Sequence, residues 1–522
     1  MREEQNMRSG WIKTLIGLAL TLPYLGCAGL LTPIPDGPDS GKLNWKATDE
    51  FCKKEVHDGK TLLTVNVPRG REAGMHAFQA MPDVKKLRGE RVTFLIRYRI
   101  QDVSEPPKPY LGSKFMVSYT ASGVKQWPGA GLPQGSSDGW KTGAFIVEFP
   151  ADASDGELTL GLEDASGRIE FDLSTLEIGI AFSPEKRVNL DYRVSYPDSV
   201  RNAPRRRGVM VPSGPVTDGM LCTLHDWGAN LIRAQITRNW GKIGTELELD
   251  EYNRWLDKRL DEIEKTAELA RKYDIKLVID LHSPPGGKID ARNMRMFFEP
   301  KYADAFLECW KKIAIRFKGN PQIYAYDLVN EPVQAIPSDC DYWELQRRAA
   351  EAVRAIDPET PIMIESNESN RPQTYPYLSA LRMDNVIYKV HMYFPLSYTH
   401  QGLRGGPVVT YPGIIDGEMW NREKIKETLQ PVRDFQLRHN CRIYVGEFSA
   451  IVWAPGADQY IRDCISVFEE YGWDWTFHAF REWAGWSVEY DGTGRDDLKP
   501  AANTKRKQAL LEGLKLNRTD RP

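Results

Sequence analysis

Eight short apolar runs recur between residues 208 and 480, and segments with helical periodicity separate them. In residues 251–273, for example, apolar side chains return every three or four positions among charged ones. The apolar runs are 208–211, 231–236, 276–282, 323–329, 361–364, 386–390, 442–445 and 475–480. The helical segments are 251–273, 301–318, 341–356, 421–438 and 457–471. This alternation predicts repeated strand–helix units around a parallel sheet.

The number of units favours one α/β architecture. Eight strand–helix units in about 330 residues fit a (β/α)8 TIM barrel with insertions, and we expect it to fill residues 188–522. A doubly wound open sheet is the alternative. Such a sheet usually has fewer strands, and no glycine-rich phosphate loop follows any of the eight runs.

The region before the barrel, residues 43–187, has a different pattern. Short runs of alternating apolar and polar residues, such as 61–67 and 91–98, are separated by clusters of turn-forming residues. No helical period is convincing in this region. The pattern predicts an all-β, jelly-roll-like sandwich of antiparallel strands.

Part of this sandwich resembles the jelly-roll carbohydrate-binding modules. The matching features are Trp140 before a strand, a turn at Gly167 and a closing strand over 169–172. The resemblance implies sugar binding through Trp127 or Trp140. A purely structural sandwich is the alternative, because either tryptophan can also belong to the core.

Residues 1–27 have the features of an export signal, and residues 28–42 those of a proline-rich linker. Basic residues precede an apolar run over 15–22, and Gly26-Cys27 resembles the cleavage box of bacterial lipoproteins. The sequence therefore predicts an exported protein, either a lipoprotein of the bacterial cell envelope or a secreted protein. An uncleaved membrane anchor is the alternative, which the shortness of the apolar run disfavours.

Charge and cysteine usage limit the classes of partner. The formal net charge is −3 and the isoelectric point is about 6.3, so no basic field favours nucleic acid. The 7 cysteines are scattered, without a CxxC pair or a metal-site spacing. We expect buried thiols, with a disulfide as the alternative, and neither a metal nor a cofactor. We expect a monomer that meets a membrane only through a lipid on Cys27.

Polar and aromatic side chains gather at the ends of six of the eight apolar runs. In a TIM barrel the carboxyl ends of the strands form the active-site face. The candidates are Arg233, His282, Asn330, Glu331, His391, Tyr393, Glu447, Trp483 and Trp486. Their positions predict one functional site at this face of the barrel.

Two of these residues, Glu331 and Glu447, suit the cleavage of an acetal. That reaction needs one protonated carboxyl at the leaving oxygen and one ionised carboxylate at the anomeric carbon. If the two carboxyls face each other at about 5–5.5 Å, they can act by double displacement with retention. Arg233 would keep Glu447 ionised, Asn330 would bind the 2-hydroxyl of the sugar, and Tyr393 would donate to Glu447.

The remaining candidates have supporting roles. His282 and His391 would bind sugar hydroxyls or tune the acid, and Trp483 or Trp486 would form the floor under the cleaved sugar. We expect four further acids near the strand ends to be structural or ion-paired. These are Asp280, Asp327, Glu365 and Glu482.

Two motifs of the barrel region, Tyr326-Asp-Leu-Val-Asn-Glu-Pro332 and Tyr444-Val-Gly-Glu-Phe448, resemble glycoside hydrolase family 5 in content and order. The resemblance implies a retaining (β/α)8 enzyme that acts on β-linked glucans, mannans and related glycans. It implies that Glu331 is the acid/base and that Glu447 is the nucleophile. By position in the same family, Trp483 is favoured as the floor.

The substrate is left open by the sequence. The favoured expectation is a β-glycan hydrolase such as an endo-β-1,4-glucanase, with a β-mannanase or an exo-acting β-glucosidase as alternatives. A transglycosylase would use the same residues, whereas a non-catalytic glycan-binding protein would not need both glutamates. The long segment 394–419 either closes one end of the cleft or lengthens it.

Overall fold

The chain folds into two compact units. The computed structural model describes residues 16–18, 30–57, 59–108, 110–403 and 406–519. The first unit holds the chain up to Ser183 together with Ala335–Asp339, and the second holds Pro184–Gln334 and Cys340–Pro522. Cys27 and nearly all of the predicted export signal lie outside the described residues.

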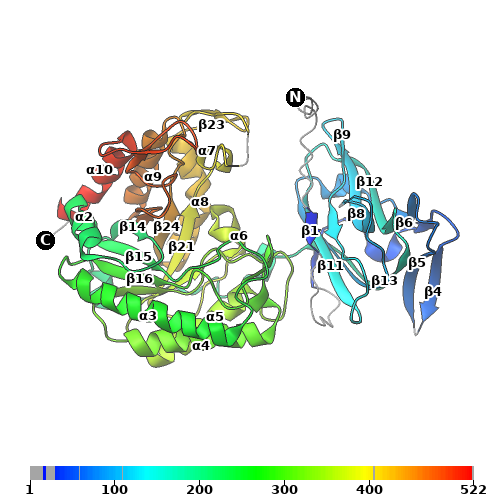
Figure 1. Cartoon of the computed structure of the whole chain (residues 1–522), viewed down its shortest axis with the longest axis horizontal. Helices are drawn as coiled ribbons and strands as arrows, with labels where there is room; N and C mark the ends of the chain where they lie inside the picture. The colour runs from blue at the N-terminus through cyan, green and yellow to red at the C-terminus, as the bar shows by residue number, and fades with distance from the viewer. Residues whose placement is uncertain (1–15, 19–29, 58, 109, 404–405, 520–522) are drawn as a thin grey trace. The chain divides into compact units, whose positions relative to one another are not determined.

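Two sheets make the first unit a β-sandwich (Figure 1). One sheet has the order β1 (Ile16–Leu18), β10 (Gly129–Gly131), β8 (Gly112–Ala121), β12 (Ser154–Glu163), β6 (Met75–Ala80) and β3 (Lys46–Ala47), with β9 (Val124–Gln126) beside β8. The other has the order β11 (Lys141–Glu148), β7 (Arg91–Gln101), β13 (Gly167–Ile180), β5 (Lys60–Val67) and β4 (Cys52–His57), with β2 (Thr32–Pro33) beside β13. All strand pairs are antiparallel except β1 with β10.

The core of the sandwich comes from the inward faces of both sheets. Phe115 and Leu160 of the first sheet and Phe94 and Phe171 of the second are fully buried in one hydrophobic cluster. The alternating strands therefore place every second side chain in this core, as the sequence predicts. The β-sandwich is confirmed.

The second unit is a closed barrel of eight parallel strands. The strands are β14 (Arg207–Val211), β15 (Leu231–Gln235), β16 (Lys276–Asp280), β19 (Ile323–Asp327), β20 (Ile362–Glu365), β21 (Val386–Met392), β24 (Arg442–Phe448) and β25 (Asp474–Phe477). Each predicted apolar run overlaps one of them, so the (β/α)8 barrel is confirmed. Nearly all strand residues are buried, because barrel strands pack on both faces.

Helices surround the barrel strands (Figure 1). They are α1 (Asp198–Arg201), α2 (Asp218–Trp227), α3 (Leu249–Arg271), α4 (Pro300–Phe317), α5 (Tyr342–Ile356), α6 (Asn367–Asn370), α7 (Leu396–Thr399), α8 (Arg422–His439), α9 (Ala457–Tyr471) and α10 (Lys505–Thr519). The five predicted helices correspond to α3, α4, α5, α8 and α9. Between β20 and β21 the chain has only α6 and a 3-10 segment, Pro372–Tyr377, where two prolines prevent a longer helix.

Short hairpins extend the loops at the ends of the barrel strands. β17 (Lys288–Asp290) pairs with β18 (Asn293–Met294) after β16, and β22 (Gly413–Ile415) pairs with β23 (Glu418–Trp420) before α8. A third hairpin, β26 (Tyr490–Asp491) with β27 (Lys499–Pro500), precedes α10. Within the described ranges, no helix has the length and apolar character needed to cross a membrane.

Candidate active site

Two glutamates from different barrel strands face each other. Glu331 follows β19, and Glu447 lies near the end of β24. Ligand-type atoms of Glu331, His391 and Glu447 all lie within 4.8 Å of one another. Carboxyl pairs separated by about 5 Å suit double displacement, whereas inverting pairs are about 6.5–9.5 Å apart to admit a water.

The two oxygens of Glu447 each accept a hydrogen bond. Arg233 Nη1 donates to Oε1 at 2.6 Å, and the Tyr393 hydroxyl donates to Oε2 at 2.9 Å. Burial acts to raise the pKa of Glu447, but the interactions with His391, His478 and Arg233 outweigh it and hold the pKa well below its usual range. Glu447 is therefore ionised at neutral pH, as a nucleophile must be.

Arg233 is fully buried and fixed by a cluster of acids. Its guanidinium lies 3.0 Å from Asp280 and 3.0 Å from Asp327, and it donates to the Asn330 side-chain oxygen at 2.7 Å. Buried charges are stable only when they are paired and hydrogen-bonded. Asp280 and Asp327, which the sequence predicts to be structural acids, therefore fix the position of Arg233. Arg233 in turn binds Glu447.

Asn330 and His282 continue this network. The Asn330 amide nitrogen lies 3.0 Å from His282 Nε2, and His282 Nδ1 lies 2.8 Å from Asp280. The amide nitrogen of Asn330 can only donate, so His282 Nε2 accepts this hydrogen bond. His282 Nδ1–H then donates to Asp280. The tautomer of His282 and the orientation of Asn330 are therefore set by Asp280 and Arg233.

Glu331 has a strained backbone and one close histidine. Its φ of 46° lies in a region that residues with side chains rarely occupy, and its backbone N–H donates to Glu365 at 2.8 Å. Its carboxyl lies 3.0 Å from His391 Nδ1. Burial acts to raise the pKa of Glu331, and the charge of Glu447 adds to this, but the interactions with His391 and Lys288 together outweigh them and lower the pKa.

His391 can serve both protonation states of Glu331. Burial lowers the pKa of His391, so the ring is neutral at neutral pH. A neutral imidazole has one donor and one acceptor nitrogen. Nδ1 can therefore donate to an ionised Glu331 or accept from a protonated one.

Lys389, which the sequence analysis did not select, belongs to the same buried network. It is fully buried on β21, 2.7 Å from Asp327, and it also pairs with Glu365. Gly446, before the nucleophile, leaves room for it, because a Cβ there would lie 2.9 Å from His391 Nε2 and closer still to Lys389. A lysine inside an otherwise apolar run could have revealed this charge cluster from the sequence, because a buried ammonium group needs buried partners.

Comparison with known proteins settles the family. The family model described as cellulase, glycosyl hydrolase family 5, matches residues 203–486, which is more than half of the chain. The chain belongs to glycosyl hydrolase family 5. It is therefore a retaining O-glycosyl hydrolase, and the matched residues include both glutamates of the pair.

Several characterised relatives and structures resemble this family 5 enzyme. Endoglucanase C of Acetivibrio thermocellus is 27% identical over 251 residues, covering 42% of this chain and 73% of that protein. Cellodextrinase A of Ruminococcus flavefaciens is 30% identical over 272 residues, covering 49% and 76% respectively. The structure of Thermotoga maritima Cel5A with cellobiose is 20% identical with a TM-score of 0.45, covering 60% of this chain and 98% of that one.

The two tryptophans of the family 5 enzyme lie at different depths. The Trp486 ring centroid is 6.1 Å from that of Tyr393, which donates to Glu447. Trp483 packs instead on Trp453 and on Trp486, with centroids 6.2 Å and 6.1 Å away. Trp486 therefore packs near the tyrosine that binds the nucleophile, although position in the sequence favours Trp483.

Two residues after β25 also belong to this site. His478 Nε2 lies 3.3 Å from Glu482 Oε2, which also accepts from Gln235 at 3.2 Å. Burial acts to lower the pKa of His478, but Glu482 and Glu447 outweigh it and raise the pKa. The charge of His478 in turn helps to keep Glu447 ionised. Sequence reasoning missed His478, because it lies inside the predicted run 475–480, whereas β25 ends one residue before it.

Three side chains of this site also have the chemistry to bind a cation. Glu331, His391 and Glu447 form a group with metal-ligand chemistry. However, Arg233 and Tyr393 already donate to both oxygens of Glu447. The cluster is therefore better explained by acid and nucleophile roles than by metal binding.

Proposed function

We propose that the enzyme is an endo-acting β-1,4-glucanase with Glu447 as nucleophile and Glu331 as acid/base. The observation that carries the assignment is the facing pair, in which only Glu447 is held by an arginine and a tyrosine. The glucan substrate rests on the relatives, which are named endoglucanase and cellodextrinase.

The reaction proceeds in two steps. Glu447 attacks the anomeric carbon while Glu331 gives its proton to the leaving oxygen, so that the aglycone departs and a covalent glycosyl–enzyme forms. Glu331, now ionised, takes a proton from water, and the resulting attack on the anomeric carbon releases Glu447. Asn330 binds the 2-hydroxyl, His282 binds another hydroxyl, and Trp486 supports the sugar ring.

The nucleophile assignment is tested by chemical rescue. Glu447→Ala should lose nearly all turnover of an aryl β-cellobioside, and added azide should restore part of it and give the α-glycosyl azide. Glu331→Gln should instead retain far more activity on this activated substrate than on cellotetraose, since a good leaving group needs no acid. Equal losses on the two substrates would exclude the acid role.

The endo mode is tested by products. An endo-enzyme lowers the viscosity of a soluble β-glucan long before much reducing sugar appears, whereas an exo-enzyme does the reverse. A panel of β-glucans, mannans and xylans should show β-1,4-glucan as the best polymer. The cellodextrinase relative and the long segment before α8 favour an enzyme restricted to short chains as the second candidate.

We also propose that the β-sandwich binds glycan through Trp127. This indole is 50% exposed, which suits stacking on a sugar. Trp140 is less suitable, since the guanidinium of Arg99 lies over its ring at 5.0 Å. Trp127→Ala should lower retention on insoluble cellulose, and Trp140→Ala should not.

For localisation, we propose export and attachment through a lipid on Cys27, with a monomeric enzyme on the bacterial cell envelope. The support is the signal-like N-terminus and its Gly26-Cys27 pair. Labelling of growing cells with a radioactive fatty acid should mark the wild-type protein and leave Cys27→Ser unlabelled. Labelling of both proteins, or of neither, would contradict lipidation at this cysteine.

A further inference from the structure

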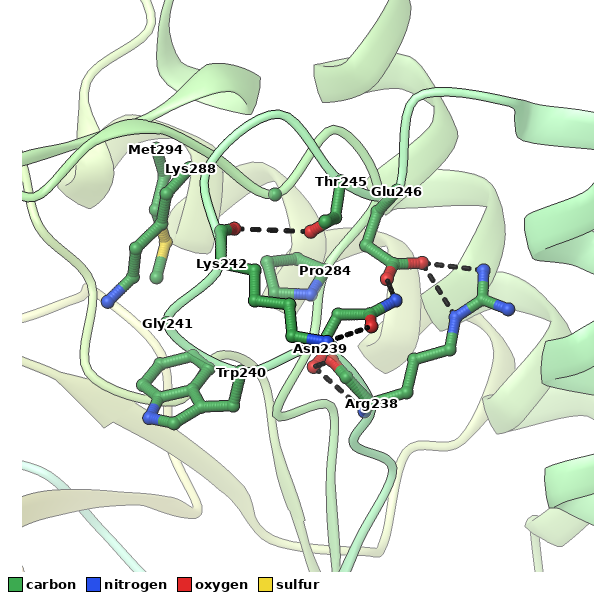
Figure 2. Close-up of a pocket in the computed structure, with 12 residues that line it drawn as sticks. Arg238, Asn239, Trp240, Gly241, Lys242, Thr245, Glu246, Pro284, Lys288 and Met294 are labelled. Carbon is green, nitrogen blue, oxygen red and sulfur yellow. Dashed lines mark hydrogen bonds and ion pairs between the residues drawn. The ribbon is translucent and has the colours of Figure 1, made fainter.

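A separate pocket opens beside the catalytic residues. It has about 280 Å³ of empty space, part of which is open to solvent, between the loops that follow β15 and β16. Figure 2 shows Trp240 and Lys288 on one side, with Arg238 and Glu246 on the other.

The positive charges of this pocket are not balanced. Arg238 pairs with Glu246 and with Glu251, both at 2.6 Å. Lys288 has no carboxylate within ion-pairing distance among the described residues, and Lys242 donates only to an asparagine oxygen, at 3.4 Å. Two ammonium groups therefore lack an acidic partner.

Lys288 is held at the pocket wall by an aromatic ring. Its ammonium lies 4.2 Å from the centroid of Trp240, a cation–π contact. Trp240 is 38% exposed, so part of the ring is open to a ligand. Burial lowers the pKa of Lys288, with the charge of Glu331 opposing this. A partly desolvated ammonium is stabilised best by an anion.

The pocket is connected to the catalytic centre through two residues. The Trp240 ring lies 4.5 Å from the ring of His282, which belongs to the Arg233 network. Lys288 and Glu331 each affect the pKa of the other. A glycan bound across the two glutamates therefore has this pocket within reach of a neighbouring sugar.

We propose that this pocket is a subsite for a sugar unit that carries an anionic group, either the carboxylate of a uronic acid or a sulfate ester. Lys288 and Lys242 bind the anion, and Trp240 forms the wall against the sugar. The inference rests on the proposed glucan hydrolysis and adds to it a preference for β-1,4-glucans that carry acidic units.

A substrate with an acidic unit would also help Glu331 to act as the acid. Four titratable groups face Glu331, namely His391, Glu447, Tyr393 and Lys288. The positive charge of Lys288 helps to lower the pKa of Glu331. An anion bound to Lys288 cancels this effect and raises that pKa, so the alkaline limb of kcat should lie at higher pH for an acidic substrate than for a neutral one.

Binding is the direct test, since it does not depend on turnover. The probes are cellotetraose, a cellotetraose with one unit oxidised at C6 to glucuronic acid, and a cellotetraose with one 6-sulfate. Each is titrated by calorimetry into the full chain carrying Glu447→Gln. We expect one or both acidic probes to bind about tenfold more tightly than cellotetraose, and the probe that gains identifies the anion.

Variants of the pocket lysines test whether the tighter binding of acidic probes comes from this pocket. Lys288→Met should bring the acidic and neutral dissociation constants within about twofold, and Lys242→Met should reduce the difference in part. The matched control is Lys272→Met, which removes a lysine lying 5.0 Å from the Tyr273 ring at the end of α3. It should leave the tenfold preference intact.

The outcomes separate the two proposals. Equal binding of all three probes, or a preference that survives Lys288→Met, overturns the acidic subsite. Turnover of the probes by the wild-type enzyme is measured in parallel. A binding preference without cleavage of any probe would overturn the glucanase proposal alone, and cleavage without a preference would overturn the subsite alone.

Discussion

Tyr393 shows how one hydroxyl serves the nucleophile. It donates to Glu447 Oε2, the oxygen not bound by Arg233. A hydrogen bond to a charged group contributes about 1.5–3 kcal/mol, so Tyr393→Phe should lower kcat/KM by about 10- to 100-fold. The measurement is hydrolysis of an aryl β-cellobioside. Tyr398→Phe is the control, because that hydroxyl donates to the Pro455 carbonyl instead. Equal activity of both variants would contradict the role of Tyr393.

His478 makes a prediction about pH. Its positive charge is one of the influences that oppose burial and lower the pKa of Glu447. His478→Gln removes that charge, so the pKa of Glu447 rises and more acid protonates it. Because Glu447 works only when ionised, the acidic limb of kcat/KM should move to higher pH. A pH profile of the variant checks this against His225→Gln, whose ring lies near Tyr273 on the surface. An unmoved acidic limb would count against His478.

For single residues, the sequence predicted which ones form the site better than it predicted the contacts that they make. Glu331 and Glu447 were found because each follows an apolar strand in a recognisable order. Lys389 was missed, since its partners Asp327 and Glu365 come from other strands. His478 was missed because it lies inside a predicted apolar run, although its partner Glu482 is only four residues away. The depth of Trp486 relative to Trp483 depends on the path of one loop, which no periodicity encodes.

β21 carries a fully buried charge. Its Lys389 neutralises Asp327 and Glu365, and Glu365 accepts from the backbone of Glu331. Lys389→Met leaves two buried acids short of a partner and should cost about 3–5 kcal/mol of unfolding free energy. Denaturation in urea measures the loss.

Two further variants sharpen that test. Adding Glu365→Gln to Lys389→Met should recover part of the stability, because the amide carries no charge yet can still accept from Glu331. Lys276→Met, at the half-buried start of β16, should cost less than about 1 kcal/mol. If Lys389→Met were as stable as Lys276→Met, the buried ion pairs would contribute little.

Elements were predictable where packing imposes a period. α3 and α5 bury one face against the barrel, and their apolar residues return every three or four positions. The crossover between β20 and β21 has no such period, since α6 and the proline-containing segment after it are fixed by specific hydrogen bonds, such as Ser366 with Asn370. Hairpins such as β17–β18 are too short to show a pattern.

The whole molecule has two units with separate cores. Every residue of the facing glutamate pair and of its network lies in the second unit, and the sandwich has its own buried cluster. The fragment 184–522 should therefore hydrolyse cellotetraose with a kcat/KM within about twofold of the full chain, since the site contains all its own supports. Its activity on insoluble cellulose should fall, as should that of full-length Trp127→Ala. Loss of cellotetraose hydrolysis in a folded fragment would show that the catalytic unit needs the sandwich, and equal activity on cellulose would contradict glycan binding by Trp127.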